Sequence, residues 1–385
     1  KNIDLKQKNQ IIEKRGPRLG SNEKAIHGFL KSNNIQENDI VIKNTKNGKF
    51  YFYLNQINGI NTSEVLPEII NEIINNFVWP KSQRWAYSEL RWARPLRNIL
   101  LLFNNQPIEG KVAIDKNNFL NFSTYTFGHR NENKKIEVEN IDEYERLLRN
   151  NYVILDRKKR KNKIINDTKL LLKDKDIKLL DDDHLLNEVL GLVEFPNVLI
   201  GTIDKQFMNL PKEVLTTAMK VHQKYFSIVD DENNLAPKFL FVSNTIPKKE
   251  RDKSIIEGNE RVLKARLSDA DFFWKTDTST KIENFNQKLK KVLFYEGLGS
   301  LHDKTIRLSA VSKYFSSLFK VDVSLAREAC ILSKFDLVSE MVGEFPELQG
   351  IMGGYYTKLN GKPNEISNAI FDQYKPKGIS NDMPK

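Results

Sequence analysis

Cysteine and long apolar runs are the scarcest features of this sequence. Cys330 is the only cysteine in 385 residues, which excludes a disulfide within the chain and a zinc site built on several cysteines. The longest apolar run extends from about Ile99 to Phe103, far short of the roughly 20 residues that a membrane-spanning helix needs. No secretory leader is recognisable. The sequence therefore predicts a protein of a reducing compartment, the cytoplasm, without a membrane segment.

Catalytic motifs are scarce as well. The sequence contains no P-loop, no glycine-rich dinucleotide loop and no Ser-His-Asp nucleophile motif. His302-Asp303 spells the dipeptide of HD-type metal phosphohydrolases, but no histidine follows His302, and such a centre needs several His and Asp ligands from different helices. Phe335-Asp336 has phenylalanine where a second such histidine would be expected. We therefore expect no catalytic residue, no metal and no cofactor in this chain.

Positive charge is abundant. Basic residues exceed acidic ones by 61 to 50, which gives a formal net charge of +11. This excess favours a polyanionic partner such as a nucleic acid, although lysines that lie outside a patch often serve only solubility. Hydrophobic residues make up 39% and charged residues 29% of the chain, which is the composition of a globular rather than a disordered protein.

The expected elements place the chain in the α+β class. Turn and alternation signals predict strands at residues 41–43, 49–54, 112–114 and 121–126, and a hairpin of 226–229 with 238–242. Residues 98–103 are expected to form a strand or the end of a buried helix. Helical periodicity predicts helices at residues 23–33, 65–77, 141–148, 156–172 and 185–193. Asp183 is expected to cap the last of these helices.

Strand signals fade after about residue 291. The remaining pattern predicts helices at residues 303–319, 324–342 and 366–374. We therefore expect an α+β region over residues 1–290, with a subdivision near 131–140, and a helical domain over residues 291–385.

One expected helix, residues 258–274, combines an apolar stripe with cations. Read as a helix, it places Leu263, Leu267, Ala270 and Trp274 on one side. Arg261 and Lys264 lie on the flank of this stripe, and Arg266 lies on its far side. Such a helix could dock on a core and still offer its cations to a polyanion, or it could be an ordinary amphipathic helix with a solvated charged face.

Arginine and tryptophan alternate between residues 79 and 97. The segment contains Trp79, Trp85 and Trp92 and, between and after them, Arg84, Arg91, Arg94 and Arg97. Arginine grips phosphate with a planar fork, and both residue types stack on bases, so this mixture suits RNA. The alternative is an Arg-Trp layer that closes the edge of a core.

Two further segments place a histidine beside a cation. His129-Arg130 follows a glycine at the end of an expected strand, where the pair could hold a phosphate. His222 and Lys224 lie where an expected helix meets a strand and could face a cleft. In both segments the alternative is a structural histidine.

Many sequence blocks, in order along nearly the whole chain, carry a resemblance to a known family. They are Arg15-Gly16-Pro17-Arg18, Arg94-Pro95-Leu96-Arg97, Phe127-Gly128-His129-Arg130, Glu188-Val189, Leu192-Val193-Glu194-Phe195-Pro196, Leu210-Pro211-Lys212-Glu213-Val214-Leu215, His222-Gln223-Lys224-Tyr225-Phe226, the 258–274 segment, Leu298-Gly299-Ser300-Leu301-His302-Asp303-Lys304, Lys334-Phe335-Asp336-Leu337-Val338 and residues 341–350. Together they resemble the beta subunit of the bacterial, two-subunit glycyl-tRNA synthetase.

This resemblance implies a tRNA-binding subunit of a glycine–tRNA ligase. In that family a separate alpha subunit carries the class II site, where ATP, with Mg, and glycine form glycyl-adenylate before transfer to tRNA(Gly), and the expected assembly is alpha2beta2. The resemblance also implies an N-terminal mixed α/β tRNA-binding region similar to the editing-type domain of phenylalanyl-tRNA synthetase beta. An all-α degenerate HD-like domain is expected to follow it.

The chain departs from the family pattern in three places. A strand-helix segment before the Gly-Pro-Arg block, and the helices and anticodon-binding domain beyond Pro384, are not part of this sequence, so we expect a fragment. Ser82-Gln83-Arg84-Trp85 replaces the usual Arg-Met-Arg-Trp, which weakens the expected contacts of that loop.

The residues expected to contact RNA are therefore nine cations. They are Arg84, Arg91, Arg94, Arg97, Arg130, Lys224, Arg261, Lys264 and Arg266. Two other functions stay open, namely a metal-dependent HD phosphohydrolase and a structural scaffold for the alpha subunit without RNA contact.

Overall fold

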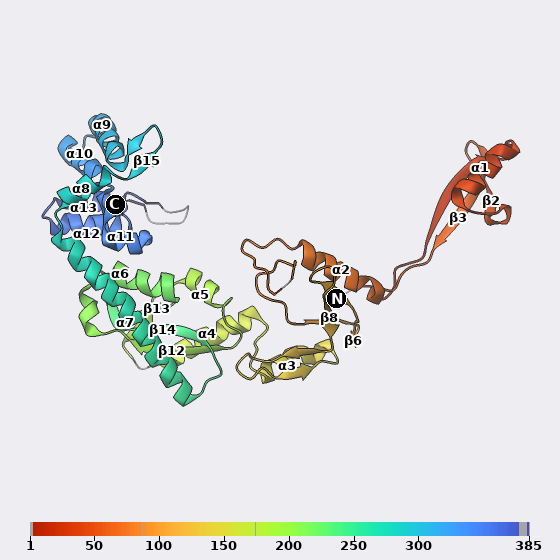
Figure 1. Cartoon of the computed structure of the whole chain (residues 1–385), viewed down its shortest axis with the longest axis horizontal. Coiled ribbons are helices and arrows are strands. Elements are labelled where there is room, and N and C mark those ends of the chain that lie inside the picture. The colour runs from red at the N-terminus through yellow and green to blue at the C-terminus, as the bar shows by residue number, and fades with distance from the viewer. Residues whose placement is uncertain (1–2, 87, 174, 377–382, 385) are drawn as a thin grey trace. The chain divides into compact units, whose positions relative to one another are not determined.

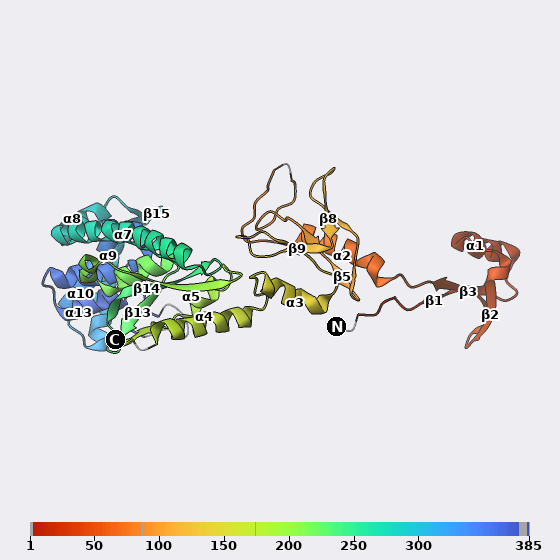
Figure 2. The ribbon, with the colours of Figure 1, turned by 90° about the horizontal axis from the view of Figure 1, so that it is seen from below.

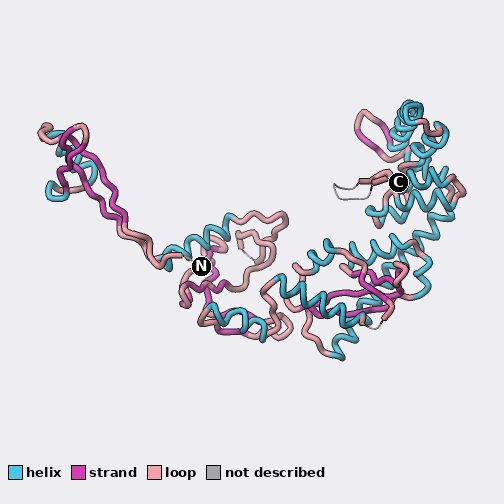
Figure 3. The backbone as a smooth tube through the Cα atoms, turned by 180° about the vertical axis from the view of Figure 1, so that it is seen from behind, coloured by secondary structure: helices cyan, strands magenta, loops and turns pink. Residues whose placement is uncertain are grey.

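The computed structural model describes residues 3–86, 88–173, 175–376 and 383–384. The chain divides into two compact units, Lys1–Asn151 and Tyr152–Lys385. The fold is mixed α+β, as predicted, with sheets up to Asn244 and mostly helices after it (Figures 1 and 3). The division predicted near residue 290 lies inside the second unit.

The first unit begins with a three-stranded antiparallel sheet in the order β1-β3-β2. Its elements are β1 (Gln10–Arg18), α1 (Glu23–Asn33), a 3-10 turn (Glu37–Asp39), β2 (Ile40–Thr45) and β3 (Gly48–Ile57). The strands predicted at residues 41–43 and 49–54 are confirmed and form a hairpin, because Thr45 pairs with Gly48 across the turn between them. Gly48 has a φ of 112°, a conformation that residues with a Cβ rarely adopt.

The rest of the first unit consists of one long helix, several short strands and a second helix. These are α2 (Thr62–Asn76), β4 (Ile99–Leu100), β5 (Leu102–Phe103), β6 (Gln106–Pro107), β7 (Lys111–Ala113), β8 (Phe119–Ser123), β9 (Tyr125–Phe127), β10 (Lys135–Glu137) and α3 (Ile141–Asn150). The ambiguous run 98–103 therefore forms strands. Asn71 of α2 accepts a hydrogen bond of 3.1 Å from the backbone N–H of Ala113, which ties α2 to β7.

The second unit is built on a four-stranded antiparallel sheet in the order β11-β13-β14-β12. Its elements are α4 (Arg157–Leu172), β11 (Ile177–Leu179), α5 (Asp183–Val189), β12 (Pro196–Thr202), a 3-10 turn (Lys205–Asn209), α6 (Lys212–Thr217), a π-helical turn (Ala218–His222), β13 (Phe226–Asp230) and β14 (Leu235–Asn244). The predicted hairpin is confirmed, with Phe226 opposite Leu240.

Helices cover both faces of this sheet (Figure 2). Residues on one face, such as Val198 and Leu240, pack with Ile164 of α4. Alternate residues on the other face, such as Phe239, pack with Leu263 of α7 (Lys249–Ser279). This alternation is the period of two that a strand imposes on its side chains.

α7 confirms the apolar stripe predicted for residues 258–274. Leu263, Leu267 and Ala270 are buried, and Trp274 is half-buried against the same core. Glu260 ties the helix to β12 by accepting hydrogen bonds from the backbone N–H and the hydroxyl of Thr202 at 2.8 and 2.7 Å.

The remaining elements are mostly short helices. They are α8 (Ile282–Leu289), β15 (Leu293–Tyr295), β16 (Gly299–Ser300), α9 (Leu301–Phe319), α10 (Val323–Leu332), a 3-10 turn (Phe335–Val338), α11 (Glu340–Glu344), a 3-10 turn (Pro346–Leu348), α12 (Ile351–Leu359) and α13 (Asn364–Asp372). None of the helices among these described residues, or elsewhere in the described ranges, is long and apolar enough to cross a membrane.

The single helix predicted over residues 324–342 is wrong. The chain leaves the helix after Leu332, and the buried Asp336 carboxylate accepts hydrogen bonds from the backbone N–H groups of Gly350 and Gly353 at 2.6 and 3.0 Å. Ser339 then caps α11 by accepting from Val342 N–H at 3.2 Å. A buried carboxylate with these distant partners outweighs the local periodicity.

Two other helix limits also differ from the prediction. The helix predicted over residues 185–193 ends at Val189, and its cap is Asp182 rather than Asp183. Asp182 accepts a 2.9 Å hydrogen bond from Leu185 N–H. Three consecutive aspartates offer equivalent caps, and the structure selects the one whose carboxylate reaches that N–H.

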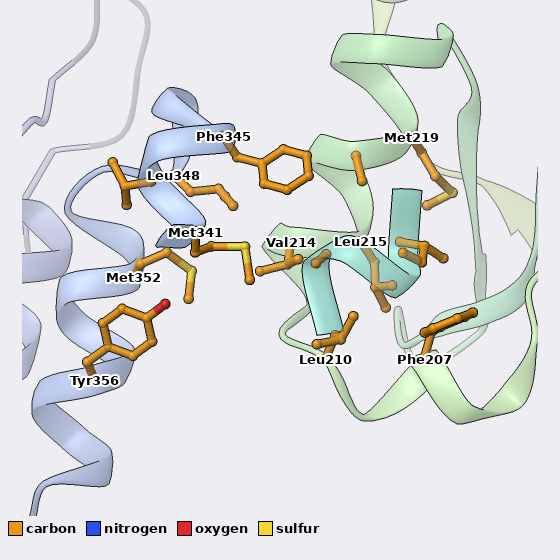
Figure 4. Close-up of a cluster of buried hydrophobic side chains, with 14 of the residues drawn as sticks. Phe207, Leu210, Val214, Leu215, Met219, Met341, Phe345, Leu348, Met352 and Tyr356 are labelled. Atoms are coloured by element: carbon orange, nitrogen blue, oxygen red, sulfur yellow. The ribbon is translucent and has the colours of Figure 1, made fainter. Parts of the chain in front are cut away.

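The largest core joins the sheet to the C-terminal helices. Met341, Phe345 and Leu348 point toward Val214 and Leu215 (Figure 4). This buried cluster takes side chains from both sides of residue 290, so the helical region and the sheet of the second unit share one core.

Candidate nucleic-acid interface

The Arg-Trp segment forms an irregular loop that follows α2 in the first unit. A short antiparallel bridge closes it, with backbone hydrogen bonds between Gln83 and Trp92 of 2.9 and 3.1 Å. Arg84 and Arg91 flank this bridge and are exposed. The Arg91 guanidinium donates to the Ser82 hydroxyl at 3.1 Å and to its carbonyl at 3.4 Å, so one side of the guanidinium is held in place.

The other three predicted cations of the first unit are also exposed. Arg94 and Arg130 have no ion-pair partner among the residues that the structure describes. Arg97 lies over the ring of Phe127, with 4.8 Å between its guanidinium carbon and the ring centre. Within the described ranges it donates a hydrogen bond of 3.4 Å to the neutral side chain of Asn133 and forms no ion pair.

The tryptophans of this segment pack against one another. The ring centres of Trp79 and Trp92 are 4.9 Å apart, and those of Phe77 and Trp79 are 4.7 Å apart. Trp79 and Trp92 are half-buried, whereas Phe77 is 50% exposed. The rings therefore build a local core edge, as the alternative interpretation predicts, while the arginines stay in solvent and the predicted RNA contact stays a prediction.

A pocket of about 780 Å³ lies beside these rings. Its walls come from the end of α2, from residues 82–91 and from the end of β7. They are Asn75, Asn76, Phe77, Val78, Trp79, Ser82, Glu89, Leu90, Arg91, Ala113, Ile114, Asp115 and Lys116. Of these residues only Arg91 was predicted as a site residue. Three stretches of chain meet here, and no local sequence signal connects Asn76 or Lys116 with Arg91.

His129 is a structural residue and not an exposed ligand. It is fully buried, its backbone N–H donates to the carbonyl of Asn151 at 2.9 Å, and its Nδ1 accepts from Asn131 N–H at 3.3 Å. Its neighbour Arg130 is exposed. The two residues of this predicted pair therefore have different environments.

The predicted cations of the second unit are mostly paired with carboxylates. Lys224 lies 2.8 Å from Glu188, Lys264 lies 3.1 Å from Asp204, and Arg266 lies 3.1 Å from Glu344. The hydrogen bond from Lys264 holds the pKa of Asp204 below its ordinary value. Only Arg261 among these four cations has no ion pair in the described part of the chain, and it is exposed.

His222 does not join Lys224 in a polar cleft. Its ring packs edge-on against Phe345, with 5.4 Å between the ring centres. Lys224 has a φ of 59° at the junction of the π-helical turn with β13, so the local backbone directs it toward Glu188.

The HD-like dipeptides hold structural positions. Asp303 accepts hydrogen bonds from the backbone N–H and the hydroxyl of Ser300, both at 2.8 Å, at the start of α9. Phe335 is buried in the core, and Asp336 binds the backbone of Gly350 and Gly353. Across the described residues, no group of three or more His, Cys, Asp or Glu side chains is placed to hold a metal ion.

Comparison with known proteins identifies the family. The model of the family described as "Glycyl-tRNA synthetase beta subunit" matches residues 1–385. The chain is 43% identical over 371 residues to the glycine--tRNA ligase beta subunit of Rickettsia canadensis (strain McKiel), covering 96% of this chain and 54% of the relative. It is 44% identical over 377 residues to that of Rickettsia bellii (strain OSU 85-389), covering 97% and 55%.

A third relative agrees with these two. The glycine--tRNA ligase beta subunit of Rickettsia akari (strain Hartford) is 41% identical over 382 residues, covering 99% of this chain and 56% of the relative. The chain thus spans about half the length of the curated relatives it matches. By the family match and these identities, the chain belongs to the glycyl-tRNA synthetase beta subunit family.

Proposed function

We propose that this chain acts as the beta subunit of a cytoplasmic glycine–tRNA ligase, binding and orienting tRNA(Gly) for ATP-dependent glycylation. The match to the beta-subunit family along residues 1–385 carries this proposal. The partner is an alpha subunit with the class II active site, in an alpha2beta2 assembly. ATP, Mg and the bond-making chemistry are assigned to that partner, because the sequence of this chain contains no nucleotide-binding or nucleophile motif.

The exposed arginines of the first unit support RNA binding. A guanidinium that contacts phosphate releases condensed counterions, and its flat face stacks on an unpaired base. Arg91 is already oriented by Ser82, so less side-chain entropy is lost when it binds. The nine predicted cations remain the proposed contacts, with those of the first unit ahead of those held by carboxylates.

We also propose domain likenesses that follow from the family resemblance. Residues 1–290 correspond to a region similar to the editing-type domain of phenylalanyl-tRNA synthetase beta. Residues 291–385 correspond to a degenerate HD-like domain. The structural positions of Asp303 and Asp336 agree with the loss of a metal centre there.

The RNA contact is tested by filter binding of tRNA(Gly) to the full chain over a range of salt concentrations. We expect the double variant Arg84→Glu, Arg94→Glu to bind at least tenfold more weakly and to lower the salt slope by about two. The matched control is Lys24→Glu with Lys31→Glu, which makes the same charge change on exposed positions of α1. An equal loss of affinity in both variants would show that only the net charge of the chain matters. An unchanged affinity in the Arg84 and Arg94 variant would favour a scaffold without RNA contact.

The division of labour is tested by a glycylation assay with tRNA(Gly), ATP and glycine. We expect product only when an alpha subunit is added to the chain. Glycylation by the chain alone would overturn the assignment of the chemistry to the partner.

An exposed apolar surface supports the protein partner. α9 buries small polar residues, including Ser309 and Ser316, and leaves large apolar ones outside. The exposed side chains of this surface and of the β15–β16 hairpin are Leu293, Phe294, Tyr295, Leu298, Ile306, Val311, Tyr314, Phe315, Leu318 and Phe319. Exposed apolar side chains that gather on neighbouring elements favour a protein interface, and the curated relatives are named as beta subunits.

Co-purification with the alpha subunit tests this surface. We expect Leu318→Lys with Phe319→Lys to lose the alpha subunit, whereas Leu170→Lys, at a position on α4 that is 71% exposed, keeps it. Retention of the alpha subunit by the double variant would exclude this surface. Concentration-dependent self-association of the chain that the double variant abolishes would assign the surface to a second copy instead.

A further inference from the structure

The pocket beside Phe77 and Trp79 has the chemistry of a nucleobase site. We infer that it binds one unpaired base of the RNA, with a preference for bases that carry an exocyclic amino group. This inference rests on the proposed function, because it specifies how the same chain holds RNA. Its evidence is the composition and the free polar groups of the pocket walls.

The apolar side of the pocket, formed by Phe77 and Val78, is open to solvent. Phe77 is 50% exposed and Val78 is 88% exposed at the end of α2. Phe77 leans on Trp79, and Trp79 on Trp92, with 4.7 and 4.9 Å between ring centres. The three rings pack at tilted and edge-on angles, so Phe77 is supported by Trp79 and Trp92 while half of its surface stays accessible to a base.

Two cations stand at the walls of the same pocket. Arg91 is oriented by its hydrogen bonds to Ser82, and Lys116 is exposed on the turn after β7. A base that stacks on the ring of Phe77 brings its phosphate with it. Arg91 and Lys116 are placed to neutralise that phosphate, which couples stacking to the electrostatic attraction.

The polar side chains that remain free suit the edge of a base. Neither the Asn76 carboxamide nor the Glu89 carboxylate has a hydrogen-bond partner among the described residues. A carboxamide both donates and accepts, and a carboxylate accepts from the amino group of cytosine, adenine or guanine. Asp115 is not available in this way, because its carboxylate already accepts from Asn117 and Asn118.

The indole of Trp79 adds an unsatisfied donor. Its Nε1–H is buried and has no acceptor within the described ranges, which costs free energy. Because this nitrogen has almost no accessible surface, a base in the pocket contacts the ring of Phe77 and the side chains of Asn76 and Glu89 rather than this donor. An acidic peptide fits less well, because its side chains offer no flat ring to stack on Phe77.

A short single-stranded RNA tests the pocket on the full chain. The probe is a six-nucleotide RNA of mixed sequence, compared with the same backbone without bases, and binding is followed by tryptophan fluorescence and by titration. We expect the normal RNA to quench the fluorescence and the abasic RNA to bind about tenfold more weakly. Trp79→Phe should remove most of the quenching, because Trp79 is the tryptophan of the pocket walls and Trp85, Trp92 and Trp274 are not among them.

Two variants separate stacking from charge. We expect Phe77→Ala to weaken binding of the normal RNA about tenfold without changing its salt slope, and Asn76→Ala to weaken it less. The matched control is Ile73→Ala, which removes a side chain that is 51% exposed on the same helix, one turn earlier and outside the pocket walls. Circular dichroism of each variant checks that the fold is retained.

The outcomes distinguish this inference from the proposed function. If tRNA(Gly) binds in a manner that depends on Arg84 and Arg94 but not on Phe77, the base site is wrong and the RNA-binding function stands. Equal binding of abasic and normal RNA, or displacement of RNA by a poly-glutamate peptide at similar concentration, also overturns the base site. If the wild-type chain binds neither RNA, both proposals fail.

Discussion

The two units of the chain use their charges differently. In the first unit the predicted RNA contacts are exposed, and where they have partners these are neutral, as with Arg91 on Ser82 and Arg97 on Asn133. In the second unit Lys224, Lys264 and Arg266 face carboxylates at about hydrogen-bond distance. A cation without a counter-charge does not have to leave an internal ion pair before it contacts a phosphate, so we expect the first unit to contribute more to the proposed RNA binding than the second.

Burial shows the opposite distribution. Both large clusters of buried apolar side chains within the described residues belong to the second unit. In the first unit, buried residues such as Leu30, Val112 and Ile136 are spread over the helix α1 and two small separate sheets. The second unit therefore contains the large buried cores and serves as the structural frame, and the first unit exposes the cations that we propose to contact RNA.

The largest expected effect is the loss of a buried carboxylate from that frame. Asp277 accepts hydrogen bonds from the backbone N–H groups of Glu340 and Met341, both at 3.0 Å, and from the Tyr356 hydroxyl at 2.8 Å. Burial, reinforced by Asp277, raises the pKa of Tyr356, so its hydroxyl remains a donor. We expect Asp277→Ala to lower the free energy of unfolding by about 3 kcal/mol, because buried donors lose their acceptor.

Urea unfolding followed by tryptophan fluorescence measures this loss. The control is Asp269→Ala, at an exposed position of the same helix, which should leave the midpoint unchanged. Equal midpoints for the two variants would mean that the contact between α7 and α11 does not hold the frame together.

The second prediction concerns pH. Burial raises the pKa of Asp336 above its ordinary value of 3.8, although the Gly350 and Gly353 N–H groups and Lys334 oppose the shift. The folded state therefore binds the proton more tightly than the unfolded state, and stability from this group is lost as the pH rises from about 3.8 through the folded pKa. Its Oδ1 is buried without a partner in the described residues, which fits a carboxyl that favours its protonated form.

The variant Asp336→Asn isolates this effect, because it cannot ionise. We expect the wild type to lose stability relative to the variant as the pH rises from 4 toward neutrality, in urea midpoints measured at each pH. Other titrating groups are shared by both proteins and cancel in the difference. Parallel pH profiles would show that Asp336 stays ionised in the folded chain.

The third prediction tests whether the carboxylates paired with cations are the reason why we expect the second unit to bind RNA less well than the first. Removing two of them with Asp204→Asn and Glu344→Gln frees Lys264 and Arg266. We expect the affinity for tRNA(Gly), measured by filter binding at fixed salt, to rise about threefold, because no internal ion pair then has to be exchanged.

A charge-matched control completes this test. Glu283→Gln with Glu365→Gln removes the same charge at exposed positions of α8 and α13. An equal gain of affinity in the control would show that the gain comes from the change in net charge alone. No gain in either variant would show that Lys264 and Arg266 do not contribute to the RNA interface.

The smallest expected effect is the loss of a surface ion pair. Arg266 and Glu344 are each 40% exposed in their side chains, and pairs of this kind contribute little. We expect Arg266→Gln to change the free energy of unfolding by no more than about 0.5 kcal/mol in urea unfolding. A decrease of the free energy of unfolding well above 1 kcal/mol would show that the Arg266–Glu344 pair stabilises the fold, so that RNA could not replace it without cost.

Local periodicity was sufficient to predict several elements. The stripe of α7 and the hairpin of β13 with β14 follow from spacings of three to four and of two, which short stretches of chain carry by themselves. The break after Leu332 was not predictable, because the partners of Asp336 are the backbone N–H groups of Gly350 and Gly353. The Asp182 cap was misplaced by one residue because its neighbours offer the same chemistry.

The amino-acid sequence by itself determined the family, the α+β class and the cationic residues, because motifs and composition are properties of the order of residues. Only the tertiary structure decided which cations are free and which are neutralised, since Arg266 and Glu344 are 78 positions apart. It also assembled the pocket of Asn76, Phe77, Arg91 and Lys116 from three separate stretches. Pairing and enclosure depend on distances in space, and the chain sets those distances only after its apolar residues have packed.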